Sequence, residues 1–387
     1  MNWEDFLGDS LDAIASQNLL RKLRGITSAQ GAEVVCEGRR FRNFSSNDYL
    51  GLAAHPALIE AARQALETGG FGAGASRLVC GTLEAHEQLE SALAAFKRCD
   101  AALSFSSGYA AAMGTIPAIC GTNDVIILDK LCHACLVDAA KLSGAHVRVF
   151  PHNNLEKMES HLKWAARVHP QARVLILAES VYSMDGDLAR LREMVEIKER
   201  FGAWLFLDEA HGVGVLGDGG RGLADAEGVA GRIEIQMGTL GKALGAHGAY
   251  VAGSAKLKEF LINRARSFIF STAPPVPVAA AAARAVEIIA GGEGDSLRMK
   301  LWENIRAFRL AGLAESAIVP IMIGDEAAAM NASARLLGAG FLIPAIRYPT
   351  VARGAARLRV TFSASHSVDD IMALNEALVL ENAGQSS

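Results

Sequence analysis

The sequence predicts an α/β protein with a mainly parallel sheet in a large domain and a smaller α+β domain after it. Short, almost continuously apolar runs alternate with stretches of helical spacing, as expected for strands buried on both faces of a sheet. The alternation stops near Pro274, and an alanine-rich stretch leads into a second pattern. The length of 387 residues is sufficient for a large core and a second domain.

Seven apolar runs are expected to form the large seven-stranded sheet. Their ranges are 101–105, 124–128, 147–150, 173–179, 203–209, 233–238 and 248–253. Three further runs, at 316–324, 341–350 and 356–364, are expected in the second domain. We divide the chain into an N-terminal segment (1–45), a large domain (46–278) and a small C-terminal domain (279–387), with which the N-terminal segment is grouped.

Composition restricts the partners and the location. The formal net charge of −4 indicates no basic stripe, so neither nucleic acid nor an anionic membrane surface is expected as a partner. The first residues are acidic and amphipathic and do not resemble a secretory signal, and no apolar run has the length of a membrane helix. We therefore expect a cytoplasmic protein that acts on small molecules, with its six cysteines as reduced thiols.

The stretch GTLGKALG places Lys242 among small residues, which favours either a phosphate-binding loop or a lysine with covalent chemistry. The DEAH stretch that begins at Asp208 favours the phosphate-loop interpretation, because nucleic-acid-dependent ATPases combine such a loop with a DEAH motif. It fails on spacing, because Gln236 and Ala243 stand where such a loop needs glycine and a hydroxyl residue. The order of the two motifs is also reversed, so covalent chemistry is favoured.

Cys132 and Cys135 flank His133 in a C-x-x-C arrangement. A metal or redox role would need a second ligand pair or a thioredoxin-like context, and the other cysteines are scattered singly. We therefore predict no metal site, and the histidine is the more interesting residue of the three.

Polar residues follow five of the predicted strands at their carboxyl ends, where ligands bind in open α/β sheets. Taken singly, each has a structural explanation as a turn, a core histidine or a helix cap. Five strand ends that each present a different polar group are hard to attribute to packing and favour a binding site. These residues are Gly108, Tyr109, His133, Ser183, Asp208, His211, Thr239 and Lys242.

Pyridoxal phosphate (PLP) would use these groups together. A lysine amine can form a Schiff base with its aldehyde, and the N–H groups of the helix that opens at Gly108 can bind its phosphate. The carboxylate of Asp208 favours a protonated ring nitrogen, which makes the ring a better electron sink.

The sequence resembles the α-oxoamine synthase family of PLP enzymes, which have the aspartate aminotransferase fold, also called fold type I. The resemblance covers nearly the whole chain and is more specific than any one motif. The resemblance rests on the stretches SSNDYLGLAAHP, GAGASRLVCGT, SSGYAA, DKLCHACLVDAA, ESVYSMDGDLA, LDEAHGVGVLG, GTLGKALGAHGAYVAGS and AIRYPTVARGAARLRVTFSASH. Relatives usually have asparagine and serine where this chain has Cys132 and Cys135, which leaves the fine position of the histidine ring open.

The resemblance implies the following roles. Lys242 would hold the cofactor covalently and later carry the substrate proton, His133 would stack on the ring, and Asp208 would pair with the ring nitrogen. His211 and Ser183 would address the ring hydroxyl. The phosphate would be bound by Gly108, Tyr109, Thr239 and, from a neighbouring subunit of a homodimer, Thr272.

For the substrates, the resemblance implies that Arg347 and Asn47 hold an amino-acid carboxylate, with Arg21 and Thr350 near the entrance. The stretches NDYLGLA and IRYPTV favour the members that join L-alanine to a pimeloyl thioester, on acyl-carrier protein (pimeloyl-ACP) or on coenzyme A (pimeloyl-CoA), with loss of carbon dioxide. Three alternatives stay open: a member that joins glycine to acetyl-CoA, a PLP lyase or aminotransferase of the same fold, and an inactive scaffold.

Overall fold

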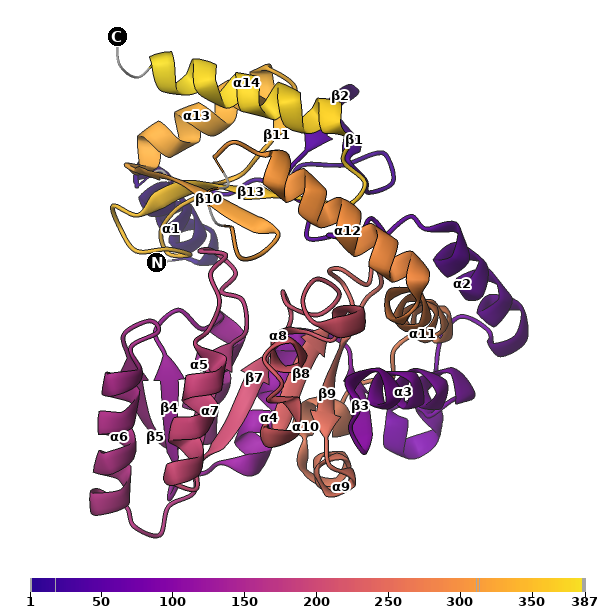
Figure 1. Cartoon of the computed structure of the whole chain (residues 1–387), viewed down its shortest axis with the longest axis vertical. Coiled ribbons are helices and arrows are strands. Elements are labelled where there is room, and N and C mark those ends of the chain that lie inside the picture. Colours follow the sequence, from indigo (N-terminus) through magenta and orange to yellow (C-terminus); the bar gives the residue numbers. More distant parts are fainter. Residues whose placement is uncertain (1, 18, 311, 313, 385–387) are drawn as a thin grey trace.

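The computed structural model describes residues 2–17, 19–310, 312 and 314–384, and the side chains as far as residue 379. A large sheet and its helices form the lower part of the molecule in Figure 1, and a smaller body with two short sheets lies above it. The α/β class predicted from the sequence, with a mainly parallel seven-stranded sheet and a smaller α+β domain, is confirmed. The domain boundaries at residues 45 and 278 stay predictions.

The large sheet has the strand order β3-β9-β8-β7-β6-β4-β5. Only β9 runs against its neighbours, and every predicted run overlaps one of the strands, with bounds that agree to within two residues. Their bounds are β3 Ala101–Phe105, β4 Val125–Asp129, β5 His146–Phe150, β6 Val174–Glu179, β7 Trp204–Asp208, β8 Ile235–Thr239 and β9 Ala249–Gly253.

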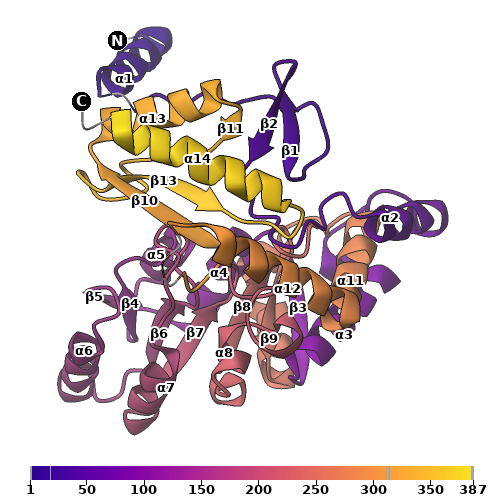
Figure 2. The same ribbon diagram turned by 45° about the horizontal axis from the view of Figure 1, so that its top comes forward.

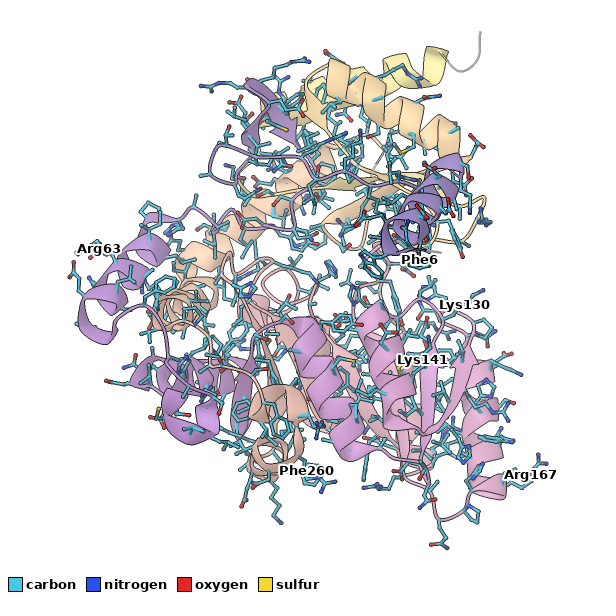
Figure 3. The ribbon with its side chains drawn as sticks, turned by 180° about the vertical axis from the view of Figure 1, so that it is seen from behind. Phe6, Arg63, Lys130, Lys141, Arg167 and Phe260 are labelled. Carbon is cyan, nitrogen blue, oxygen red and sulfur yellow. The ribbon has the colours of Figure 1, made fainter. Side chains whose placement is uncertain are left out.

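Helices cover both faces of this sheet, which explains why its central strands are almost entirely apolar. One face packs against α4 (Gly108–Ile119), α5 (Ala134–Ser143), α9 (Ala255–Arg264) and α10 (Arg266–Ile269). The other face packs against α6 (Leu155–Val168), α7 (Leu191–Arg200) and α8 (Leu223–Ala226). Arg167, in the last turn of α6, points away from the sheet (Figure 3).

A third group of helices connects the large sheet to the upper body. It consists of α2 (Pro56–Gly69), α3 (Glu84–Lys97), α11 (Val276–Ala290) and α12 (Gly292–Ala307), which share one apolar core with the small domain. Three short helical turns complete the lower part, at η1 (Arg77–Gly81), η2 (Asp218–Gly220) and η3 (Ala230–Arg232).

The small domain contains the antiparallel sheet β10-β13-β12. Its elements are β10 (Ile318–Gly324), α13 (Glu326–Gly338), β12 (Ala345–Ile346), β13 (Ala356–Thr361) and α14 (Val368–Gly384), and α13 and α14 lie over the sheet in Figure 2. The predicted run 341–350 is broken into β11 (Phe341–Leu342) and β12, because Pro344 and Pro349 lack the N–H that a continued strand needs.

The N-terminal segment belongs structurally to this small domain. After α1 (Trp3–Ser16), the hairpin of β1 (Glu33–Cys36) and β2 (Arg39–Asn43) pairs in parallel with β11. The chain then descends to the large domain, and its backbone oxygens at Phe44 and Tyr49 accept the N–H groups of Thr361 and Ala364. None of the helices in the part of the chain that the structure describes is both long and apolar enough to cross a membrane.

His366 holds this descending segment in place, and its burial makes the free energy of unfolding depend on pH. Its ring is buried, stacks on Phe44 with centroids 4.2 Å apart, accepts the Ser363 N–H through Nδ1 (3.1 Å) and donates from Nε2 to the Asn43 carbonyl (3.0 Å). Burial lowers the pKa of His366 from 6.5 to about 4. As the pH falls below 6.5, this histidine therefore becomes protonated in the unfolded chain, whereas in the folded protein it becomes protonated only near pH 4.

The free energy of unfolding is therefore expected to fall by about 2 to 3 kcal/mol through this residue between pH 7 and pH 4.5. Urea unfolding of the wild type and of His366→Gln at both pH values measures the difference. The variant should be less stable at pH 7 but should lose less stability on acidification. His55→Gln, at a partly exposed histidine, is the matched control. Equal losses in wild type and His366→Gln would contradict the assignment.

Candidate active site

The carboxyl ends of β6 and β7 bring two buried acidic groups together. Glu179 and Asp208 are register partners on neighbouring parallel strands, and both side chains are buried. The Glu179 carboxylate accepts the backbone N–H of His133, which follows β4. Burial and the neighbouring Asp208 raise the pKa of Glu179 well above its ordinary value. The sequence predicted Asp208 here but assigned no role to Glu179.

Asp208 and Lys242 influence each other's charge. Burial raises the pKa of Asp208 to about 6, against the opposing effects of Lys242 and of the Ala210 N–H, which Asp208 accepts at 2.8 Å. Burial lowers the pKa of Lys242, although Asp208 and Glu179 oppose this change. A lysine with a lowered pKa has more of the neutral amine that attacks a carbonyl group.

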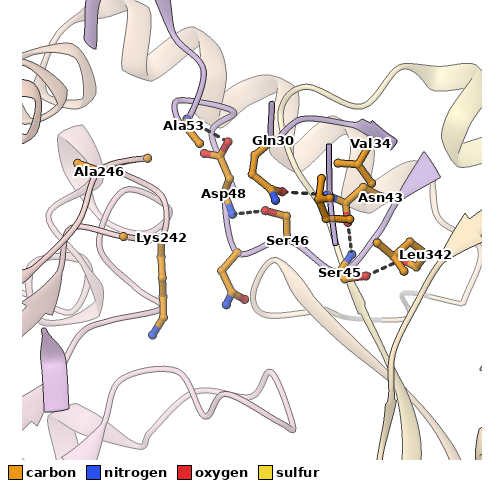
Figure 4. A pocket seen from close by; sticks show the side chains of 14 residues that line it. Gln30, Val34, Asn43, Ser45, Ser46, Asp48, Ala53, Lys242, Ala246 and Leu342 are labelled. Carbon is orange, nitrogen blue, oxygen red and sulfur yellow. Dashed lines mark hydrogen bonds between the residues drawn. The ribbon is translucent and has the colours of Figure 1, made fainter. Parts of the chain in front are cut away.

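Lys242 lies at the edge of a cavity of about 450 Å³. The lysine and its loop form one side, and the descending segment with Ser45, Ser46 and Asp48 forms the opposite side (Figure 4). Asp48 stabilises that side, because its carboxylate accepts the N–H groups of Leu52 (2.8 Å) and Ala53 (3.1 Å). The cavity lies between the lysine loop and the descending segment, and the predicted site residues in its lining are Lys242 and Asn47.

The small residues around Lys242 have a second cause besides access. A Cβ on Gly238 would lie 2.4 Å from the Tyr250 hydroxyl, and one on Gly245 would lie 2.3 Å from the Leu52 backbone. Gly245 also has a φ of 63°, a conformation that favours glycine. The small residues of GTLGKALG are therefore required by tight packing as well as by access to the Lys242 amine.

The start of α4 forms a cradle beside β8. Ser107 caps the helix by accepting the Ala110 N–H at 3.0 Å, and a Cβ on Gly108 would lie 2.9 Å from the Thr239 methyl group. Gly108 and Thr239 are therefore brought together, with free helix N–H groups at the same place. Tyr109 is 45% exposed, and its hydroxyl donates to Asp138.

His133 caps α5 with its own ring. Its Nδ1 accepts the Cys135 N–H at 3.3 Å and lies 3.0 Å from the Cys135 sulfur. Burial and the nearby Lys242 lower the pKa of His133, so the ring is neutral and Nε2 carries the proton. Cys132 is turned the other way, toward the Leu177 carbonyl (3.4 Å). All six cysteines are free.

The Cys135 thiol is expected to help hold the His133 ring. Cys135→Ala should lower kcat/KM by about threefold to tenfold, the effect of one weak hydrogen bond, while Cys135→Ser should stay within about twofold of the wild type. Steady-state kinetics of the two variants measures the difference. Equal activity of Cys135→Ala and the wild type would show that the backbone N–H of residue 135 is sufficient.

Arg359 is the functional residue that the sequence analysis missed. Its side chain is buried, donates from Nε to the Ser183 carbonyl at 2.6 Å, and donates from both terminal nitrogens to Asn47 Oδ1 at 3.1 Å. Asn47 Oδ1 also lies 3.1 Å from the Tyr49 hydroxyl, which contacts His211 Nδ1 at 2.6 Å. Burial, Lys242 and Arg359 lower the pKa of His211 well below its ordinary value, so this ring is neutral.

Arg347, predicted beside Asn47, lies in a different cluster. Its side chain donates to the Leu20 carbonyl at 3.2 Å and approaches the Met330 sulfur at 3.0 Å, while Arg359 occupies the place beside Asn47. The side chain of Arg21 donates to Thr350 at 3.4 Å, so these two predicted residues do meet.

Thr272 is exposed and pairs with Ser76 through an isolated bridge. It therefore lies on the surface beside the GAGASRLVCGT stretch, where an exposed threonine can be presented to another chain.

The donor set fits PLP. Within the described residues, no salt bridge reaches the Asp208 carboxylate, which leaves a buried acid without the cation that a protonated ring nitrogen would provide. The cradle at Gly108 offers N–H groups for a phosphate, and Lys242 offers an amine for an aldehyde. No cluster of three potential metal ligands occurs among the described residues.

Comparisons with known proteins agree with this site. Residues 40–378 match the family model for class I and II aminotransferases. The 8-amino-7-oxononanoate synthase of Geobacter sulfurreducens is 48% identical over 373 residues, which cover 94% of this chain and 95% of that protein. Seven further similar relatives, at 42% to 48% identity, carry the same name, one of them as a putative member.

Solved structures give the same result. A variant of serine palmitoyltransferase from S. paucimobilis, bound to a PLP–myriocin aldimine, has a TM-score of 0.91 at 29% identity and covers 99% of this chain and 97% of its own. The 8-amino-7-oxononanoate synthase of Francisella tularensis has a TM-score of 0.75 at 27% identity, covering 90% and 99%. The predicted cofactor is thereby confirmed. The chain belongs to the class I and II aminotransferase family, as a PLP-dependent transferase whose similar relatives are 8-amino-7-oxononanoate synthases.

Proposed function

We propose that this enzyme condenses L-alanine with a pimeloyl thioester to give 8-amino-7-oxononanoate, carbon dioxide and the free carrier thiol. The observation that carries the proposal is the coincidence of two facts. Relatives with this name match the chain over nearly its whole length, and Lys242 lies close enough to Asp208, His133 and Arg359 for their charges to interact, which supports a shared site. The name of the relatives places the reaction in biotin biosynthesis.

Amino-acid binding would use the positive charge of Arg359. The guanidinium is held by the Ser183 carbonyl and Asn47, so it can accept a carboxylate without losing its orientation. Because the rings of His211 and His133 are neutral, the positive charge beside Asn47 comes from Arg359. An amino acid with a free carboxylate is therefore matched in charge.

Proton transfer would fall to Lys242. Bound PLP supplies a sink for the electrons left at the substrate α-carbon, and Asp208 maintains the protonated ring nitrogen on which this sink depends. Lys242, with its lowered pKa, takes the α-proton as a neutral amine. The α-carbon then bonds to the thioester carbonyl carbon, the carbon–sulfur bond breaks, and the thiolate leaves to be protonated.

Decarboxylation follows, because the new ketone is β to the carboxylate. The bond from the α-carbon to the carboxylate breaks, carbon dioxide leaves, and Lys242 returns a proton to the same carbon. The neutral His133 can donate from Nε2 to the thioester oxygen during acyl transfer.

The remaining site residues are assigned as follows. Gly108, Tyr109 and Thr239 would bind the phosphate and Ser183 and His211 would address the ring hydroxyl, while Thr272 would reach the phosphate from the partner in a homodimer. Arg21, Thr350 and Arg347 would line the entrance for the acyl chain, and a cytoplasmic location follows from the substrates. The dimer is tested by sedimentation of the holoenzyme.

A product assay by mass spectrometry tests the reaction. Purified enzyme receives L-alanine with pimeloyl-CoA in one tube, L-alanine with pimeloyl-ACP in a second, and glycine with acetyl-CoA in a third. Product in either of the first two tubes supports the proposal and identifies the carrier. Product in the third tube alone would replace the proposed substrates with glycine and acetyl-CoA and would leave the roles of Lys242 and Asp208 intact.

A further inference from the structure

A cluster of three side chains near Ser183 links residues at or after the ends of β4, β5 and β6. The mechanism above does not use this cluster. Its centre is His152, two residues after β5. The ring Nδ1 lies 3.1 Å from Asp129 Oδ1 at the end of β4, and Nε2 lies 2.6 Å from Asp187 Oδ2 in the loop that follows β6. We call these three residues the His152 clamp. Because carboxylates only accept hydrogen bonds, both ring nitrogens donate and the ring is a cation.

The charge of the clamp is stable at neutral pH. Burial opposes a charge on His152, but the hydrogen bonds that its ring donates to Asp129 and Asp187 outweigh this effect and raise the pKa of the imidazole to about 10. The Tyr182 ring stands edge-on to the imidazole, with centroids 4.3 Å apart. The clamp is therefore a fixed ion pair at neutral pH.

One end of the clamp organises the segment that carries His133. Asp129 is fully buried, and its carboxylate also accepts the N–H groups of Leu131 (2.8 Å) and Asn153 (2.9 Å). Asn153 has a φ of 53°, which asparagine tolerates better than most residues, and its side chain donates to the Leu188 carbonyl at 2.9 Å.

The other end of the clamp holds the loop 182–188. Within it, the Gly186 N–H donates to the Tyr182 carbonyl (2.8 Å) and the Tyr182 N–H donates to the Asp187 carbonyl (3.0 Å). The opposite side of the loop meets the small domain, where the Ser183 carbonyl accepts from Arg359 (2.6 Å) and Asp185 pairs with Arg357 (2.6 Å).

We propose that His152 is a positioning residue: it anchors the loop 182–188 to the end of β4 and thereby sets the direction in which Arg359 presents its guanidinium to the substrate carboxylate. The inference rests on the proposed function in one respect, namely that Arg359 receives that carboxylate. His152 itself touches neither the substrate nor the cofactor. Without the clamp, the contact between the Ser183 carbonyl and Arg359 Nε would no longer be fixed relative to the end of β4 and the large domain.

The test uses the PLP-loaded enzyme and three variants. His152→Gln removes the cation, Asp187→Asn weakens the loop end at a partly exposed position, and His169→Gln changes a histidine elsewhere on the large domain as the control. The dissociation constant for L-alanine is measured by absorbance titration, and backbone hydrogen exchange of residues 182–188 is measured on the enzyme without substrate.

His152→Gln is expected to weaken L-alanine binding by about tenfold, the effect of losing hydrogen bonds between charged groups, and to speed exchange in the loop, with PLP still bound. Asp187→Asn should act in the same direction, and the double variant should be no worse than the weaker-binding single variant by more than about twofold. His169→Gln should match the wild type. If His152→Gln does not fold, Asp187→Asn carries the test.

Unchanged alanine affinity together with faster loop exchange would overturn the positioning role, since the clamp would then stabilise the loop without orienting Arg359. If hydrogen exchange of residues 182–188 were the same in His152→Gln as in the wild type, the proposal that His152 anchors this loop would be wrong. Failure of the proposed function is distinguishable, because the wild type would then not bind L-alanine. The loop exchange and a titration with glycine would in that case decide the inference.

Discussion

Replacement of Lys242 by alanine is expected to lower turnover by more than about 10⁴-fold, because one residue would both attach the cofactor and carry the α-proton. Burial lowers the pKa of its amine, and among the residues that the structure describes no second lysine acts on the charges of Asp208 and Glu179. Product formation is measured by mass spectrometry at saturating substrates. The variant should also lose the absorbance of a lysine-bound cofactor while keeping its fold by circular dichroism.

Two further variants separate charge from chemistry. Lys242→Arg keeps a cation beside Asp208 but cannot form the covalent bond at neutral pH, so it should be as inactive as the alanine variant. Lys256→Ala, at an exposed lysine in α9, should match the wild type. Substantial turnover by Lys242→Ala would assign the base to another residue.

Replacement of Asp208 by asparagine is expected to slow the reaction by about 10²- to 10⁴-fold, with a much smaller effect on the affinity for L-alanine. Asparagine preserves the shape and can still accept the Ala210 N–H, but it cannot hold a proton on the ring nitrogen by charge. The exchange of the L-alanine α-proton with solvent deuterium, followed by nuclear magnetic resonance without any thioester, measures this step alone.

Asp208→Glu should recover part of the exchange rate because it restores the charge, and Asp100→Asn, at an exposed position, should leave the rate unchanged. The expected pattern is a loss in rate with nearly constant alanine affinity. A loss of affinity with an unchanged exchange rate would instead indicate that Asp208 serves docking.

The large sheet and the cofactor residues could be predicted because their signals are local. Each central strand is a short apolar run, and the polar residue that matters follows the run within a few positions, as with Asp208 and His133. The parallel arrangement then gathers these ends at one edge. Gly108 and Thr239 were predicted for the same reason, and the structure brings them into contact.

Arg359 could not be predicted in this way, since its environment is created by distant segments. Arg357 and Arg359 alternate in ARLRV as exposed residues of an edge strand would, yet both are buried against the loop 182–188, more than 170 residues earlier. Arg347 occurs in a more distinctive stretch, IRYPTV, and for that reason it was Arg347 that we predicted to hold the carboxylate. The only local signal for Arg359 was the presence of two arginines on one face of a short strand that is otherwise apolar.

Glu179 and His152 were missed for a related reason. Glu179 was read as the end of a strand, and its acceptance of the His133 N–H depends on the order in which β4 and β6 lie side by side. The spacing along the chain contains no information about that order.

The pairing of the first residues with the last third of the chain has a consequence for synthesis in the cell. β2 depends on β11, and Asn47 meets Arg359 only after more than 300 intervening residues have been made. A chain still on the ribosome can therefore assemble the sheet that carries Lys242 and Asp208 well before it can bind an amino-acid carboxylate. Under the proposed function, the incomplete chain would hold Lys242 without Arg359, the proposed carboxylate ligand, and Arg359 would become available only when β13 has been synthesised.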